Sequence, residues 1–431
     1  MRLVDPHEMR RTGLRTMAGR RAGGSGPALA SAQQIIEEVV RGGDRALKEF
    51  TRRFDGVDLP ELRVSAREFD EAEEQVPAGL RQAIALASGN IEAFHRPQVP
   101  QPIEVETRPG ILCRREWRAI DPVGLYVPGG TAPLISTVLM LGIPARLAGC
   151  REIILCTPPS RTGSIAPAIL FAARSVGIRT VFKAGGAQAI AAMAAGTGSV
   201  PAVRKIFGPG NRFVAAAKSI VSKEPYNVAV DLVAGPTELM VIADGSADAR
   251  LVASDLVSQA EHGEDSEVVL VTTSAPFAEA VERECREQLI SLPRAQVAAK
   301  VIERAPVLVV GNLDEAFEAA NLYAPEHLSL AVVQAGSFIG RISNAGSVFI
   351  GPMSAVAFGD YASGTNHTLP TAGTARSAGG VTVESFLKPV FFQTIDREGA
   401  AILGPAVRAL AIAEGLDGHA RAAEYREKND D

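Results

Sequence analysis

A glutamate and a histidine stand side by side in the segment LYAPEHLSL, where a predicted helix gives way to an apolar strand. Pro325 ends the helix, and Glu326 and His327 then enter the strand. Ionisable side chains at such a junction are costly to bury unless they are paired or used in chemistry. An imidazole beside a carboxylate can accept and release protons near neutral pH, which makes this pair a candidate acid–base centre. A strand that begins in water would carry the same residues, so both interpretations stay open.

A second polar pair lies in the segment ADARLVASDLVSQAEHG. Its apolar residues have helical spacing, and Gly263 predicts the end of the helix. Gln259 and His262 are three residues apart and therefore share one face of the last turn. That end of a helix carries partial negative charge, which favours a bound cation. A histidine that contacts the last carbonyl groups of the helix would explain the same pattern.

Two further polar clusters follow towards the C-terminus. The glycine-rich segment GDYASGTNHTLPTAG presents Asp360, Asn366 and His367 after a predicted strand. We expect it to be a loop at the carboxyl end of that strand, where open α/β sheets usually bind ligands. The segment AEGLDGHAR contributes Glu414 and His419. A solvated terminal helix would account for the latter pair equally well.

Gln259, His262, Asp360 and His419 together would form a set of nitrogen and oxygen ligands without a thiolate. Two imidazoles, a carboxylate and an amide oxygen suit Zn²⁺, and Mn²⁺ or Co²⁺ can occupy the same kind of site. The four residues are too far apart in the sequence for spacing alone to join them.

The composition is that of a soluble globular protein, with 46% hydrophobic and 22% charged residues. The net charge of −5 gives no electrostatic reason to expect a nucleic acid or an anionic membrane as partner. The most apolar run, residues 134–143, is about half of what a bilayer requires and stops at Pro144. The N-terminus lacks the apolar core of a secretory signal.

The cysteines lack the spacing of a disulfide framework or of a metal cluster. We expect each to be a small buried apolar side chain in a protein of the reducing cytoplasm. They are Cys113, Cys150, Cys156 and Cys285.

From Gly124 onwards, short apolar runs alternate with helical stretches, which predicts an α/β fold with two Rossmann-like parallel-sheet domains. The helical C-terminal tail is expected to be separate. The expected divisions are an N-terminal arm at 1–25, a helical segment at 26–115 packing on the second α/β domain, a first Rossmann-like domain at 116–235, the second α/β domain at 236–380 and the tail at 381–431.

Several longer segments are distinctive in combination. They include GLYVPGGTAPLISTVLMLGIPARLAGC, KAGGAQAIAAMAAGT, KIFGPGN, LVAGPTE, SQAEHGEDSEVVLVT, YAPEHL, GDYASGTNHTLPT and AEGLDGHAR. With these runs in this order, the chain resembles histidinol dehydrogenases along nearly its whole length. The resemblance implies a cytoplasmic homodimer with intertwined tails and shared active sites, which uses NAD and one Zn²⁺ per subunit.

The resemblance also implies roles for individual residues. The implied metal ligands are Gln259, His262 and Asp360 of one subunit and His419 of the other. The implied acid–base pair is Glu326 and His327. The implied NAD contacts are Tyr126, Gln188 and Asn211. The residues implied to face the substrate are Thr237, Gln259, His262, His327, Asp360, His367, Glu414 and His419.

The activity implied is the four-electron oxidation of L-histidinol, through L-histidinaldehyde, to L-histidine in histidine biosynthesis. In this scheme zinc orients the substrate. His327 is the base in both oxidations, and Glu326 activates the water that adds to the aldehyde. The reactive aldehyde stays in a closed site between the two steps.

The chain departs from the family pattern at several positions. Thr131 and Thr237 stand where the family usually has serine, and the added methyl groups narrow the pocket. The stretch 354–358 replaces a Pro-Glu pair that many members carry, which removes a carboxylate expected near the substrate amine, although Glu414 is retained. The chain also lacks a G-x-G-x-x-G fingerprint, so its motifs alone do not predict NAD.

These departures keep a family paralogue that oxidises another polyol or amino alcohol, such as a sulfonated diol, as the alternative. A zinc hydrolase that uses Glu326 with a metal-bound water is a rival from another class. A binding protein without catalysis is the third possibility, and the intact set of metal and acid–base residues argues against it.

Overall fold

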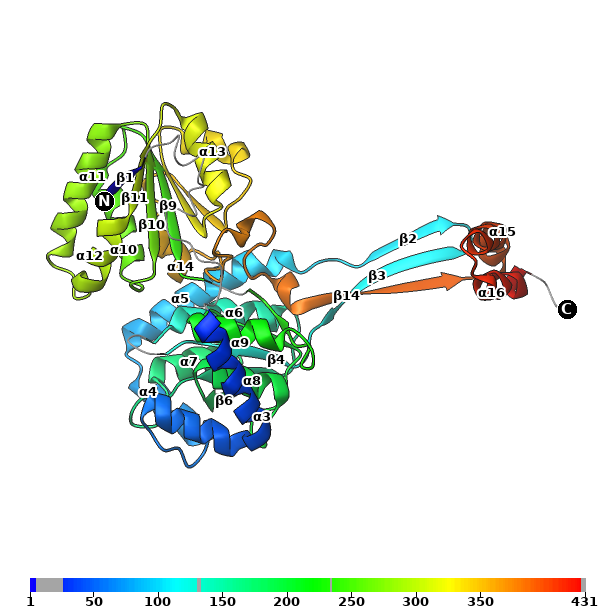
Figure 1. The fold of residues 1–431 in the computed structure, drawn as a ribbon. Helices are drawn as coiled ribbons and strands as arrows, with labels where there is room; N and C mark the ends of the chain where they lie inside the picture. Colours follow the sequence, from blue (N-terminus) through cyan, green and yellow to red (C-terminus); the bar gives the residue numbers. More distant parts are fainter. Residues whose placement is uncertain (5–25, 130–132, 233–234, 428–431) are drawn as a thin grey trace.

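The computed structural model describes residues 1–4, 26–129, 133–232 and 235–427. They form two α/β domains and a long arm that projects away from both (Figure 1). The predicted α/β class with two parallel sheets is therefore confirmed. Thr131 and most of the expected N-terminal arm lie outside the described residues. No helix within the described ranges is long and apolar enough to cross a membrane.

The first domain is built on a five-stranded parallel sheet with the strand order β6-β5-β4-β7-β8. Its strands are β4 (Val123–Tyr126), β5 (Ile153–Thr157), β6 (Thr180–Lys183), β7 (Lys205–Phe207) and β8 (Ala229–Val230). Its connecting helices are α6 (Ile135–Leu147), α7 (Pro167–Ser175), α8 (Gly186–Ala195) and α9 (Arg212–Val221). The central strand β4 is buried along its whole length, because helices cover both faces of the sheet.

The helices near the N-terminus complete this first domain. They are α3 (Gly26–Asp55), α4 (Ala66–Gln75) and α5 (Ala78–His95), and the short 3-10 turn η1 (Arg96–Gln98) follows. The apolar stripe of α3, which includes Ile36 and Val39, packs in one core with Phe182 and Met193. The expectation that the segment 26–115 packs on the second domain is therefore wrong. Helix α3 packs on α8 and α9, α4 packs on α7, and α5 packs on α6, so the connecting helices of the first domain supply the surface that these helices cover.

The second domain contains a six-stranded parallel sheet with the order β1-β11-β10-β9-β12-β13. Its strands are β1 (Arg2–Val4), β9 (Glu238–Ala243), β10 (Glu267–Thr272), β11 (Pro306–Val309), β12 (His327–Ala331) and β13 (Ser347–Ile350). Its helices are α10 (Ala249–Ala260), α11 (Ala275–Leu289), α12 (Ala295–Arg304), α13 (Leu313–Tyr323) and α14 (Val356–Tyr361), with 3-10 turns η2 (Ala335–Arg341) and η3 (Thr374–Arg376). The first residues of the chain are thus an edge strand rather than part of an arm.

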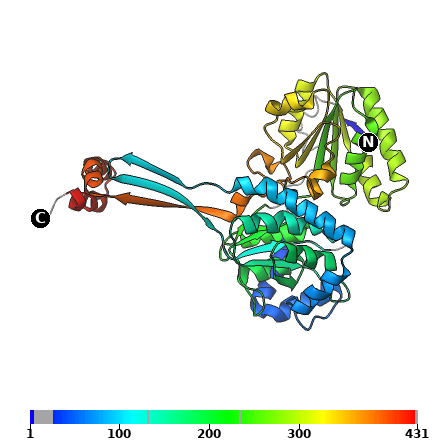
Figure 2. The same ribbon diagram turned by 180° about the vertical axis from the view of Figure 1, so that it is seen from behind.

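The arm is a three-stranded antiparallel sheet with the order β14-β3-β2, and it carries two helices at its far end (Figures 1 and 2). It consists of β2 (Ile103–Arg108), β3 (Ile111–Ala119), β14 (Leu387–Ile395), α15 (Arg397–Ala413) and α16 (Asp417–Glu427), and the 3-10 turn η4 (Val383–Phe386) precedes β14. The tail at 381–431 was expected to be helical, but it is helical only in part, because it begins with η4 and the strand β14. Its strand pairs along its full length with β3 from the segment expected to be helical.

All four cysteines are free thiols. Three of them are buried as expected, and burial raises the pKa of Cys156 and Cys285 to about 12, so they are inert. Cys113 is the exception because it lies exposed on the arm.

A buried ion pair fixes the turn between β7 and α9. The Lys218 and Asp231 side chains are only 3% and 2% exposed. Lys218 Nζ donates to the Gly208 carbonyl at 3.0 Å, and the Gly208 N–H donates to Asp231 Oδ2 at 2.7 Å. Gly208 has φ +119°, and a Cβ there would lie 2.0 Å from the carbonyl oxygen of Tyr126. The ion pair therefore holds this glycine close to the end of β4.

We predict that Lys218→Met lowers the free energy of unfolding by roughly 3–5 kcal/mol, because it leaves the Asp231 carboxylate buried without its partner. Urea denaturation of the full-length chain measures the change. Lys223→Met is the matched control on the exposed side of the same segment, with an expected effect within about 0.5 kcal/mol. Equal effects of the two substitutions would show that the buried pair does not stabilise the fold.

Candidate active site

The centre of the candidate site is the pair at the start of β12. Glu326 and His327 are 6% and 3% exposed, so the interpretation as a strand start in water is wrong. Helix α13 ends at Tyr323, and β12 begins at His327 between β9 and β13. The pair therefore lies at the start of an internal strand of the six-stranded sheet, next to the edge strand β13.

The main chain of Glu238 holds both side chains of the pair. Its N–H donates to Glu326 Oε2 at 2.8 Å, and its carbonyl accepts from His327 Nδ1 at 3.0 Å. Thr237 Oγ1 donates to the same Glu326 oxygen at 2.6 Å and accepts a hydrogen bond from Gln259 Nε2. The strand β9, the residue before it and, through that residue, the helix α10 thus fix the orientation of the two ionisable groups.

The other ring nitrogen of His327 is buried without a hydrogen bond. Nε2 lies 3.3 Å from Asp360 Oδ1, but the two atoms do not have hydrogen-bonding geometry. Because a carbonyl only accepts, Nδ1 carries the proton that it shares with Glu238, and Nε2 holds the lone pair when the ring is neutral. Burial alone would lower the pKa of His327, but the Glu326 and Asp360 carboxylates outweigh it and raise the pKa.

His367 joins this site to the first domain. Its Nδ1 lies 2.8 Å from the Asp360 carbonyl, and its Nε2 lies 3.2 Å from Thr137 Oγ1 near the start of α6. The neighbouring Asn366 Nδ2 donates to the Met140 carbonyl on the same helix at 2.7 Å. Burial lowers the pKa of His367, which favours the neutral imidazole.

The site lies at the amino ends of the strands in the second domain. Thr237 directly precedes β9, Glu326 directly precedes β12, and His327 is the first residue of β12. Asp360 lies on α14, because this short helix follows β13 and brings the carboxylate to His327. The expectation of a loop site at a carboxyl strand end is therefore wrong for Asp360.

Three of the four proposed metal ligands lie near one another. Gln259 contacts Thr237 from the end of α10, and the charge of His262, two residues beyond this helix, acts on Asp360. Asp360 keeps a lowered pKa, since the neighbouring histidines outweigh the effect of burial. Within the described part of the chain, no three His, Cys, Asp or Glu side chains are arranged to hold a metal ion.

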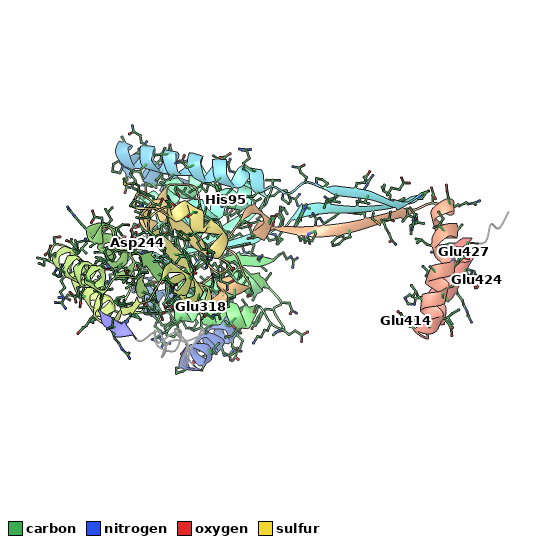
Figure 3. The ribbon with its side chains drawn as sticks, turned by 90° about the horizontal axis from the view of Figure 1, so that it is seen from above. His95, Asp244, Glu318, Glu414, Glu424 and Glu427 are labelled. Atoms are coloured by element: carbon green, nitrogen blue, oxygen red, sulfur yellow. The ribbon has the colours of Figure 1, made fainter. Side chains whose placement is uncertain are left out.

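The fourth expected ligand, His419, and the expected substrate contact Glu414 lie on the arm. His419 belongs to α16, and Glu414 caps α15 at the far end of the arm. Figure 3 shows Glu414 on these helices, away from both α/β domains. Within a single chain, these two residues do not reach the site.

The three residues expected to contact NAD lie at strand and helix ends of the five-stranded domain. Tyr126 ends β4, and its hydroxyl accepts a hydrogen bond from the Gly186 N–H at 3.0 Å. Gln188 lies in the first turn of α8, 2% exposed, with a buried Oε1 that has no hydrogen-bond partner. Asn211 caps α9 and accepts hydrogen bonds from Phe213 and Val214 at 3.0 and 3.2 Å.

Glu238 and Thr137 were not identified from the sequence. Glu238 is 1% exposed, and its Oε1 accepts a hydrogen bond from the Ala372 N–H at 2.8 Å. The carboxylate at the start of the apolar run ELMVIA could have marked Glu238 as a buried polar residue that needs a partner. Thr137 lies within an apolar helix and gave no such signal.

The comparisons with known proteins agree over more than nine-tenths of the chain. The sequence profile described as histidinol dehydrogenase matches residues 20–427. The chain belongs to the histidinol dehydrogenase family. A histidinol dehydrogenase of Bacteroides fragilis is 50% identical over 396 residues, 92% of each chain, and one of Xylella fastidiosa is 50% identical over 392 residues, 91% of each chain.

A crystal structure of histidinol dehydrogenase from Elizabethkingia anophelis has the same fold. It superposes with a TM-score of 0.94 at 42% identity and covers 99% of this chain and 98% of that chain. The arm and both α/β domains are thus features of this histidinol dehydrogenase fold. The departure at 354–358 lies where α14, the helix that carries Asp360, begins, and Ala355 stands at its N-cap position without a side-chain hydrogen bond.

Thr237→Val is expected to lower the free energy of unfolding by about 1–3 kcal/mol, because Gln259 Nε2 loses its acceptor in a buried position. Thr237→Ser keeps the hydroxyl and serves as the control, with a change below about 1 kcal/mol. Chemical denaturation compares the two variants. If valine were tolerated as well as serine, the Thr237 hydroxyl would not hold this network together.

Proposed function

We propose that the protein is a zinc-containing histidinol dehydrogenase that oxidises L-histidinol with NAD, through L-histidinaldehyde, to L-histidine in histidine biosynthesis. The relatives that are 50% identical over more than nine-tenths of the chain support this substrate over another polyol or amino alcohol. The observation that carries the proposal is the buried His327 Nε2, which has no hydrogen bond and lies beside Asp360.

The residues around Asp360 fit a zinc ion. Gln259, His262 and Asp360 offer an amide, an imidazole and a carboxylate, the donor types that zinc accepts. They form an incomplete set within one chain, and we assign the remaining position to His419 of a second subunit. When bound, zinc orients the imidazole and amine of the substrate and polarises its alcohol oxygen.

His327 acts as the general base in both oxidations. The Glu238 carbonyl fixes the proton on Nδ1, so Nε2 is the atom that removes a proton from the alcohol and later from the aldehyde hydrate. The ring is held between Glu238 and Asp360, and the nearby carboxylates stabilise the imidazolium that forms.

Glu326 activates the water that adds to the aldehyde. Both of its hydrogen bonds, from Thr237 and Glu238, fall on Oε2. Oε1 is therefore the oxygen that accepts a proton from the water. The burial of Glu326 and His327 excludes bulk solvent from the two groups.

Tyr126, Gln188 and Asn211 are the residues that would hold NAD, and the buried, unpartnered Gln188 Oε1 supports a ligand there. NAD, when bound, accepts hydride in each oxidation. The contact of Thr137 with His367 brings the start of α6, which follows β4, to the substrate side. The proposed NAD residues of the first domain and the proposed substrate residues of the second domain are thus joined by this contact.

The active enzyme is a homodimer in which each arm completes the site of the other subunit. The arm holds His419 and Glu414 far from their own α/β domains (Figure 3). It also exposes large apolar side chains, with Phe391 at 73% and Leu410 at 65%, which a partner would cover. The free thiols suit a cytoplasmic enzyme.

We predict that His327→Asn slows both oxidations by about 10²–10⁴-fold, because it removes the base that the two steps share. Glu326→Gln mainly slows the aldehyde step, so histidinaldehyde accumulates. Wild-type enzyme forms two NADH per histidinol. Stopped-flow absorbance and quantification of the aldehyde separate the steps. A Gln variant that stalled at the first oxidation would contradict this division of roles.

Subunit sharing is tested by mixing two inactive variants, His327→Asn and His419→Asn. In a mixed dimer, one site combines an intact body with an intact arm from the other chain. Random reassociation therefore restores about a quarter of the wild-type activity. No recovery, with mixed dimers confirmed by mass spectrometry, would show that each arm does not serve the partner.

A further inference from the structure

An aspartate at the end of the long helix α3 has no role in the oxidation described above. Asp55 is the last residue of α3, and Gly56, with φ +73°, follows it. Arg52 and Arg53 in the last turn suit the negative end of the helix dipole, whereas a carboxylate at this end is repelled. The stability of the helix therefore does not explain Asp55.

One oxygen of the Asp55 carboxylate is enclosed. Oδ2 is buried and has no hydrogen-bond partner. Burial raises the pKa of Asp55 to about 6. A buried acceptor without a donor is unfavourable and uncommon in folded proteins, so a ligand that donates a hydrogen bond would stabilise this position.

Asp55 lies near the residues assigned to NAD, because α3 packs on α8, the helix that carries Gln188, and residues of α3 share one core with Tyr126. Burial raises the pKa of Tyr126 to about 12, and the charge of Asp55 adds to this effect. The Tyr126 hydroxyl accepts a hydrogen bond from Gly186 and keeps its own proton to donate. The unpartnered Gln188 Oε1 lies against Gly186, because a Cβ on this glycine would be 2.6 Å from it.

This neighbourhood suits a hydroxyl group. Asp55 and Gln188 offer acceptors, and Tyr126 offers a donor. A ribose hydroxyl both donates and accepts, and a carboxylate is the group with which dinucleotide-binding proteins commonly hold a ribose. A phosphate has no proton to give at neutral pH and would be repelled by Asp55.

We propose that Asp55 binds a ribose diol of the cofactor, beside Tyr126 and Gln188. The proposal rests on the NAD dependence proposed above. It adds a residue from the N-terminal helix α3, outside the strands and helices that carry the three expected contacts, and it makes this helix part of the cofactor site.

Isothermal titration calorimetry of the full-length protein with NAD tests the assignment. Asp55→Asn should weaken NAD binding about tenfold or more, because a charge-assisted hydrogen bond is lost. Asp58→Asn is the matched control, since the Asp58 side chain is 86% exposed, and its affinity should equal that of the wild type. Unchanged affinity in a folded Asp55→Asn protein would overturn the proposal.

Deoxy analogues of NAD provide a second test that needs no variant. The wild-type protein should bind an analogue lacking a hydroxyl on one of its riboses several-fold more weakly than NAD. The Asp55→Asn protein should bind NAD and that analogue alike. Equal binding of NAD and every deoxy analogue by the wild type would overturn the assignment. Failure of the wild type to bind NAD at all would instead contradict the proposed function.

Discussion

The peptide groups on either side of one residue, Glu238, hold the two ionisable side chains on which the proposed chemistry depends. One N–H binds Glu326 and one carbonyl binds His327. The strands β9 and β12 pair in parallel with His327 opposite Leu239. This register places the start of β9 beside the side chains of Glu326 and His327. Because β9 is buried along its whole length, these peptide groups cannot rotate without breaking the sheet. The fold thus compensates the cost of burying both groups and fixes which imidazole nitrogen is the base.

The second constraint is the contact between domains. His367 and Asn366 reach from the loop after α14 to the first helical turns of α6. Since α6 follows β4, this contact links the site of Glu326 and His327 to the strand end that carries Tyr126. Asn90 on α5 adds a hydrogen bond to the Ala362 carbonyl at 2.9 Å. The N-terminal helices therefore pack on the first domain and also contact the segment after α14 in the second domain.

Local patterns predicted the parts of the site that depend on local structure. Pro325 marked the end of α13, and helical spacing placed Gln259 in α10. The packing of α3 was wrongly predicted because its apolar stripe could pack on either domain. The arm was missed because β14 pairs with β3 across a long sequence separation, Leu387 opposite Ala119. Asp360 reaches His327 because α14 folds back from the end of β13 towards the start of β12. Residue spacing in the sequence does not predict this path. The assignment of NAD and zinc came from the resemblance to the family.

The most direct test of the central claim is a crystal structure of the His327→Asn variant with zinc, NAD and L-histidinol. The account predicts that the substrate hydroxyl lies within hydrogen-bonding distance of the side chain at position 327, with the hydride-bearing carbon facing the nicotinamide. A hydroxyl directed away from position 327, towards a different proton acceptor, would contradict it.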